Sequence, residues 1–189
     1  LVLGVTIVGR PHAARGPVLR STAKVGDGVY VTGQLGNSLA SGRHMTFEPR
    51  VREGQWLCDA LGAGLTAMMD ISDGLGRDAG RMGVASGVVL EIDAAAIPLH
   101  ADCRGWEQAA GEGEDYELLF CVDEGRAGAK LPAMCPPGAG AGGGASTGIG
   151  TRLTRIGQVR ATTASEKAGS VIVAASGQRL RADEMGWEH

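Results

Sequence analysis

The stretch MMDISDGLGRD (Met68–Asp78) determines how the middle of the chain is interpreted. Apolar residues run directly into Asp70, and the polar residues that follow lead into a second periodic segment. We predict a short strand at 67–69 and a helix that opens at the polar residues. Ser72 or Asp73 would cap this helix, because a short oxygen-bearing side chain accepts hydrogen bonds from the first free backbone N–H groups.

The two aspartates of this stretch can also belong to a metal site. Asp70 would stand at the carboxyl end of a strand, where ligands often bind. Asp73 lies three residues later across a tight turn, so both carboxylates can converge on one hard cation. Mg²⁺ often takes only one or two protein oxygens and completes its shell with water and substrate phosphate. From spacing alone, helix capping and metal binding both remain open.

Outward from this stretch, helices and strands follow one another without a strict strand–helix–strand period. Hydrophobic periodicity predicts helices at 51–64, from 72 onward and at 103–111. Strand-forming runs between turn residues lie at 1–9, 25–33, 67–69, 88–98, 114–123 and 151–161, with a hairpin at 169–181. This order predicts an α+β fold, a mixed sheet with helices packed on it, rather than a doubly wound parallel sheet.

Composition excludes several classes of protein. The 189 residues are 43% hydrophobic, enough for one domain with a substantial core. A net charge of −3 without a basic stripe argues against a nucleic-acid partner. No apolar run reaches the roughly 18 residues of a transmembrane helix, so we expect no membrane partner. The four cysteines show neither CxxC nor zinc spacing and are typical of free thiols in the cytoplasm.

Two further stretches contain groups suited to ligand binding. GEDYEL (Gly113–Leu118) presents Glu114 and Asp115 after a glycine turn, where they could contact a cationic or hydroxylated ligand. The alternative is a solvated loop before an ordinary strand. VTGQLGNS (Val31–Ser38) is a strand that enters a glycine-containing loop, whose amides could approach a phosphate with Arg20 as counter-charge. Here the alternative is a simple turn.

Trp187, near the end of the chain, is either a core residue or a stacking surface. His12, His44 and His100 fall in expected loops and form no visible set of metal ligands.

Taken in order, these stretches resemble the C-terminal domain of thiamine-monophosphate kinase, a family of the aminoimidazole ribonucleotide synthetase-like superfamily. The similarity covers essentially the whole chain, and the pair DISDGL and GEDYEL is its most specific part. The segments that carry it are Arg20–Asp27, Val31–Ser38, Pro49–Arg50, Asp70–Leu75, Gly113–Leu118, Arg155–Gly157 and Gly186–His189.

This resemblance implies a reaction and its ligands. Such enzymes transfer the γ-phosphoryl group of ATP to thiamine monophosphate with Mg²⁺ and form thiamine diphosphate. The resemblance also implies a homodimer for the full-length protein. No residue is assigned to catalysis beyond metal and phosphate positioning. The implied site residues are Asp70 and Asp73 for Mg²⁺, Arg20 and Ser72 for ATP, and Glu114 and Trp187 for thiamine monophosphate.

The resemblance also implies a division into domains. Residues 1–10 would be the last strand of an N-terminal ATP-binding domain that this chain otherwise lacks, and residues 11–189 the C-terminal α+β domain. The segment between Ser38 and Pro49 is short for the family and is expected to lack a helix. The glycine-rich run at 136–148 is expected to be a flexible loop without catalytic importance.

Two other interpretations remain. The chain could come from another ATP-using enzyme of the superfamily, of the selenophosphate or aminoimidazole ribonucleotide synthetase type. Those relatives place different residues where Asp70–Gly74 stands, which argues against them. Alternatively, an isolated chain of this kind could be a non-catalytic binding or dimerisation module, because much of the nucleotide site would lie elsewhere.

Overall fold

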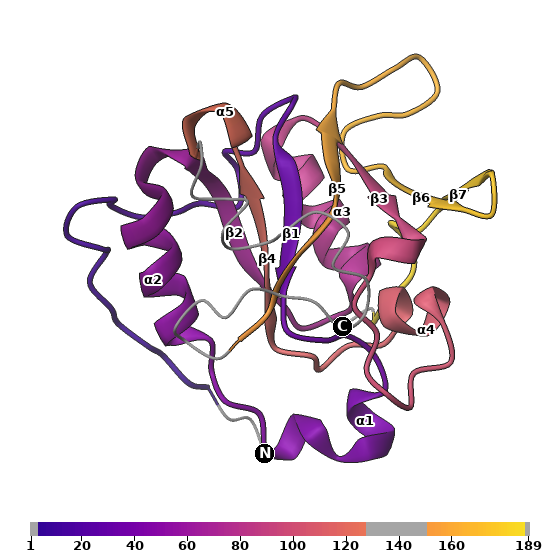
Figure 1. Ribbon diagram of the computed structural model, residues 1–189, viewed down its shortest axis with the longest axis horizontal. Helices are drawn as coiled ribbons and strands as arrows, with labels where there is room; N and C mark the ends of the chain where they lie inside the picture. The colour runs from indigo at the N-terminus through magenta and orange to yellow at the C-terminus, as the bar shows by residue number, and fades with distance from the viewer. Residues whose placement is uncertain (1–3, 128–150, 188–189) are drawn as a thin grey trace.

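A mixed seven-stranded sheet forms the centre of the computed structural model, which describes residues 4–127 and 151–187 (Figure 1). The strand order is β2-β4-β1-β5-β3-β6-β7. The strands are β1 (Gly28–Thr32), β2 (Leu65–Ile71), β3 (Val89–Asp93), β4 (Glu117–Val122), β5 (Leu153–Arg160), β6 (Val171–Ala175) and β7 (Gln178–Arg181). β3 and β6 pair in parallel, and the other neighbouring strands pair antiparallel. The predicted mixed sheet is therefore confirmed.

Helices cover both faces of this sheet. The α-helices are α1 (Ser38–Ser41), α2 (Val51–Leu61), α3 (Leu75–Ser86), α4 (Trp106–Gly111) and α5 (Glu124–Ala127). Short 3₁₀ turns lie at Arg43–Met45, Gly62–Gly64 and Ala94–Ala96. Among the described helices, none combines the length and the apolar character needed to cross a bilayer.

Alternating side chains of the strands supply two separate cores. Val29 and Val31 of β1 belong to the hydrophobic cluster that α3 covers, whereas Tyr30 between them belongs to the cluster that α2 covers. Tyr30 stacks on Phe120 of the neighbouring strand β4, with ring centroids 5.4 Å apart. A sheet with both faces buried explains why all five residues of β1 are buried although the strand is short.

Two sequence-based predictions are wrong. Residues 4–9 form no strand, and Val5, Ile7 and Val8 are exposed. Their β-branched residues suit a strand, but a strand also needs a paired neighbour and a covered face. The segment after Ser38 was expected to lack a helix, yet α1 and the 3₁₀ turn form there. The predicted glycine-rich loop at 136–148 lies outside the described residues.

Polar contacts occupy the start of one edge of the sheet, and the strand at the other edge carries charged side chains. At the β2 edge, Arg15 Nη2 donates to the Leu65 carbonyl at 2.6 Å, and the Thr22 hydroxyl donates to the Thr66 carbonyl at 2.5 Å. At the other edge, every residue of β7 is exposed. Arg179 of β7 pairs there with Glu91 of β3 at 2.8 Å.

Candidate active site

Three stretches that are far apart in the sequence meet where β2 ends and β4 begins. The antiparallel pairing of β2 with β4 places the turn after β2 beside the turn before β4. The Glu114 N–H donates to the Ser72 carbonyl at 2.7 Å, and the Trp187 N–H donates to the Asp73 carbonyl at 2.9 Å. The structure therefore brings together the predicted acids, the predicted Glu114 and the predicted aromatic residue.

Gly113 lies where these three stretches touch. A Cβ at this position would lie 3.2 Å from Asp73 Cα, 3.2 Å from Trp187 Cδ1 and even closer to the Ser72 carbonyl oxygen. The backbone atoms of Ser72 and Asp73 cannot move away cheaply. Only glycine therefore fits the contact.

Gly113→Ala is expected to lower the free energy of unfolding by about 1–3 kcal/mol, the usual cost of overpacking. It should also change the fluorescence of Trp187, because the new methyl group presses on its ring. Urea denaturation and tryptophan emission measure both effects. Gly9→Ala is the control, since a Cβ there meets no atom within 4 Å. Equal stabilities of the two variants would contradict the close contact.

The turn after β2 is capped from inside helix α3. Oδ2 of Asp78 accepts hydrogen bonds from the N–H groups of Ser72 and Asp73, both at 2.9 Å. Gly74, directly before the helix, has φ 112° and makes no side-chain cap. The predicted cap by Ser72 or Asp73 is therefore wrong, because these residues supply the N–H groups and Asp78 supplies the acceptor. Burial raises the pKa of Asp78, and the two N–H donors oppose that shift.

The two predicted metal ligands stand in different surroundings. Asp70 is exposed and makes no side-chain hydrogen bond or ion pair within the described part of the chain. Asp73 is 8% exposed, and its carboxylate forms an ion pair with Arg81 of α3. No group of three or more acidic, histidine or cysteine side chains suited to a metal occurs in residues 4–127 and 151–187. Two carboxylates nevertheless fit Mg²⁺, which takes its other ligands from water and phosphate.

Tyr116, which the sequence analysis did not select, joins these acids. Its hydroxyl donates to Glu114 Oε2 at 2.9 Å. The pKa of Tyr116 is raised first by this hydrogen bond, then by burial and by the negative charges of Glu114, Asp70 and Asp73. Its ring stacks on that of Phe47, with ring centroids 4.1 Å apart. The negative charges of three acids thus act on the Tyr116 hydroxyl. Its position inside GEDYEL was the one feature of the sequence that could have pointed to this residue.

The glycine-containing loop after β1 is joined to the same region through a buried acid. The Gly36 N–H lies 3.0 Å from both carboxylate oxygens of Asp115, and Arg43 Nη2 donates to Oδ1 at 2.6 Å. Burial raises the pKa of Asp115 to about 7, against the opposing effects of the Gly36 N–H and Arg43. The Ser38 hydroxyl also donates to the Glu114 carbonyl at 2.6 Å. Asp115 therefore fixes the loop rather than facing a ligand.

A second buried acid, Glu117, anchors the start of helix α2. Arg50 donates to both of its oxygens, from Nε at 2.8 Å and from Nη2 at 2.7 Å. The Thr32 hydroxyl donates to Oε2 at 2.6 Å. Glu117 is 1% exposed, so this is an internal ion pair rather than a surface one. Neither role was predicted from the sequence, although an acid that opens an apolar strand was a visible signal.

Arg20 lies away from the acids. Its carbonyl accepts a hydrogen bond from the Ser86 hydroxyl at 3.0 Å, at the last residue of α3. Asp73 lies two residues before the first residue of that helix, and a helix of this length spans about 18 Å. The structure therefore does not place the Arg20 backbone with the other predicted site residues, and its contact with ATP stays a prediction.

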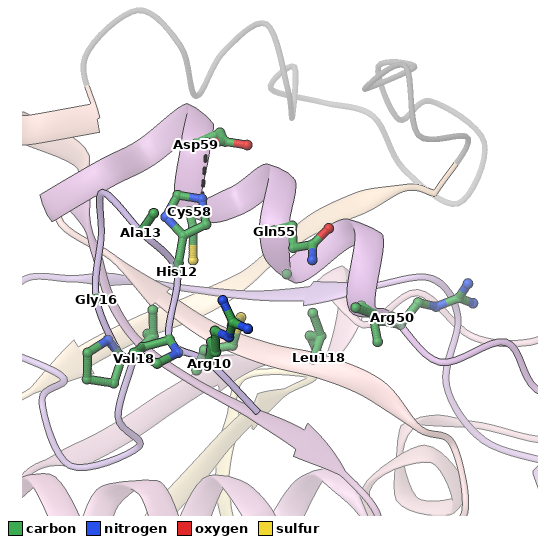
Figure 2. A pocket seen from close by; sticks show the side chains of 15 residues that line it. Arg10, His12, Ala13, Gly16, Val18, Arg50, Gln55, Cys58, Asp59 and Leu118 are labelled. Carbon is green, nitrogen blue, oxygen red and sulfur yellow. Dashed lines mark hydrogen bonds and ion pairs between the residues drawn. The ribbon is translucent and has the colours of Figure 1, made fainter. Parts of the chain in front are cut away.

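A cavity of about 770 Å³ opens on the α2 side of the sheet and is lined by residues of the segment 10–18 and of α2 (Figure 2). Figure 2 shows His12 reaching across to Asp59 of α2, with the His12 Nε2 and Asp59 Oδ1 atoms 3.1 Å apart. Arg50 and Leu118 also line the cavity, which contains none of the predicted site residues. Arg50 thus has the cavity on one side and Glu117 on the other.

Comparisons with known proteins confirm the resemblance. No family model matches the chain. The thiamine-monophosphate kinase of Halobacterium salinarum is 33% identical over 193 residues, covering 91% of this chain and 56% of that protein. The enzyme of Rhodopirellula baltica is 35% identical over 131 residues, or 65% of this chain and 40% of that protein. The chain thus spans about half the length of the curated relatives it matches.

Solved structures show the same fold. AaThiL complexed with AMPPCP and TMP aligns with a TM-score of 0.58 at 26% identity, over 91% of this chain and 54% of that one. The hydrogenase maturation protein HypE in complex with ATP aligns with a TM-score of 0.65 at 18% identity, over the same shares. The second similarity concerns the fold alone. The chain is therefore a relative of the thiamine-monophosphate kinases, with the α+β fold of the aminoimidazole ribonucleotide synthetase-like superfamily.

Proposed function

We propose that the chain is part of an enzyme that phosphorylates thiamine monophosphate with ATP and Mg²⁺ and forms thiamine diphosphate. One observation carries the proposal: the predicted acids Asp70 and Asp73, Glu114 and Trp187 meet in one region although their sequence positions are far apart. The thiamine-monophosphate kinases among its relatives and the AMPPCP and TMP bound in AaThiL support the same reaction.

On the phosphate side, Asp70 and Asp73 would hold Mg²⁺, and Ser72 and Arg20 would contact ATP. When bound, the metal neutralises charge on the phosphate oxygens, which is most of what phosphoryl transfer requires of an enzyme. The exposed Asp70 offers its carboxylate directly. The backbone of Ser72 is held in place by the buried Asp78, so this turn presents its groups in a fixed orientation.

On the substrate side, Glu114 would oppose the positive charge of the thiazolium ring. The Tyr116 hydroxyl holds the Glu114 carboxylate at 2.9 Å and thereby orients it. Trp187 is 49% exposed, so part of its side chain is free to stack on the substrate. An aromatic face beside a cation and an acid nearby form a favourable cation–π arrangement.

We further propose that residues 1–10 join an N-terminal ATP-binding domain of the complete enzyme to the C-terminal α+β domain at 11–189. The high exposure of Val5, Ile7 and Val8, at 79%, 89% and 91%, supports a covering partner for this segment. A cytoplasmic homodimer would be the working form. Sedimentation of the complete protein measures its subunit number, and a monomer would contradict this part of the proposal.

Asp73→Asn in the complete protein is expected to lower Mg²⁺-dependent formation of thiamine diphosphate roughly a hundredfold, because one metal ligand loses its charge. Thiamine diphosphate is quantified by its thiochrome fluorescence, and circular dichroism checks the fold. Asp102→Asn is the control, since it removes one exposed acid elsewhere. Unchanged turnover in Asp73→Asn would contradict the metal assignment. A wild-type protein that does not phosphorylate thiamine monophosphate would contradict the proposed function.

A further inference from the structure

Arg81 forms an ion pair with Asp73, one of the two carboxylates that the proposed function assigns to a metal ion. Its Nη1 donates to Asp73 Oδ2 and, at 2.9 Å, to Asp78 Oδ1. The Asp78 side chain is wholly buried and that of Asp73 is 11% exposed, whereas the Arg81 side chain is 40% exposed. The guanidinium thus forms a positive bridge between two acids while part of its side chain remains in contact with solvent.

The two acids depend on Arg81 to different degrees. Asp78 already has two backbone N–H donors on its other oxygen, from Ser72 and Asp73. Its charge therefore keeps strong partners without Arg81. The carboxylate of Asp73, in contrast, forms its ion pair with Arg81.

Asp70 provides the contrast. It is the exposed member of the pair and has no ion-pair partner in the described ranges. One of the two proposed ligands is thus open, and the other is neutralised by a cation that belongs to the chain itself. A divalent cation approaching Asp73 would meet both an engaged oxygen and a like charge.

We propose that Arg81 is a built-in counter-cation that must leave Asp73 before a divalent cation binds there, and that it thereby weakens metal binding at this site. The inference rests on the proposed function only in taking Asp73 as a metal ligand. Arg81 remains tethered to the wholly buried Asp78, so it can release Asp73 without leaving the site. Its partly exposed side chain has solvent on one side into which to move.

The test measures Mn²⁺ binding to the chain by electron paramagnetic resonance, without any turnover. Arg81→Gln removes the charge but keeps a donor for Asp78, and it should tighten Mn²⁺ binding about tenfold because a like charge has gone. Arg81→Lys keeps the charge and should bind close to wild type. Adding Asp73→Asn to Arg81→Gln should abolish the gain. Circular dichroism checks the fold, and Arg81→Met is a second neutral variant if Arg81→Gln folds poorly.

Arg126→Gln is the matched control. It removes an equal charge from an arginine that pairs with an acid three residues earlier, Asp123, on a different helix. Equal tightening in this control would show a net-charge effect and overturn the proposal. Unchanged, weaker or absent Mn²⁺ binding in folded Arg81→Gln would also overturn it. If Arg81→Gln binds more tightly while the complete protein does not phosphorylate thiamine monophosphate, the counter-cation stands and the proposed function fails.

Discussion

Arg50→Met is expected to lower the free energy of unfolding by about 3–5 kcal/mol, the usual cost of leaving one partner of a buried ion pair alone. Glu117 is 1% exposed and receives both Nε and Nη2 of Arg50. The Thr32 hydroxyl would still donate to it at 2.6 Å, but a neutral donor does not balance the charge. Urea denaturation at neutral pH measures the loss.

Two further variants make this result specific. Arg52→Met changes the next arginine of the chain, which is exposed, and should alter stability by less than about 0.5 kcal/mol. Arg50→Met combined with Glu117→Gln removes both charges and should recover part of the loss, because no uncompensated carboxylate remains. A loss below about 1 kcal/mol in Arg50→Met alone would show that Glu117 does not depend on this cation.

Asp115 is expected to make stability fall as the pH rises. Its pKa is about 7 in the folded protein against an ordinary value of 3.8. Between these values the folded chain keeps a proton that the unfolded chain has lost, so raising the pH favours unfolding. The contribution is fully present below pH 3.8 and is lost as the pH rises through 7. Asp115 contributes up to about 4 kcal/mol to the free energy of unfolding in this way.

Asp115→Asn should remove this part of the pH dependence. Free energies of unfolding from urea titrations at several pH values between 4.5 and 8 give the slope for each protein. Asp102→Asn, which changes an exposed aspartate, should keep the wild-type slope. If Asp115→Asn also kept it, the proton would not reside on Asp115 in the folded state. The midpoint of the remaining slope would then give the folded-state pKa of the group that does hold the proton.

Local patterns in the sequence were sufficient for most of the fold. β1 lies within its predicted range because turn glycines bound an apolar run on both sides. β2 extends beyond the predicted 67–69 on both sides, from Leu65 to Ile71, because its pairing with β4 covers this longer range. Residues 4–9 were predicted as part of a strand and form none, because a strand-like composition does not supply a neighbouring strand.

The site was predictable only in part. Glu114, Trp187 and the aspartates lie in recognisable motifs, and the structure brings them together. The ion pairs that hold the surrounding loops were not predictable. Arg50 and Glu117 are 67 residues apart, and Arg43 and Asp115 are 72 residues apart. Hydrophobic periodicity reports on neighbours within one element, so it contains no information on such pairs.

The polar contacts at the β2 edge and the charges on the β7 edge have a consequence for behaviour in concentrated solution. An unpaired strand edge can recruit a strand from another molecule and start fibrous aggregation. In this protein, Arg15 and Thr22 take up the carbonyls at the start of β2, and β7 carries long charged side chains. Removing the charges of Arg179 and Arg181 would therefore endanger colloidal stability well before it affected the folded core.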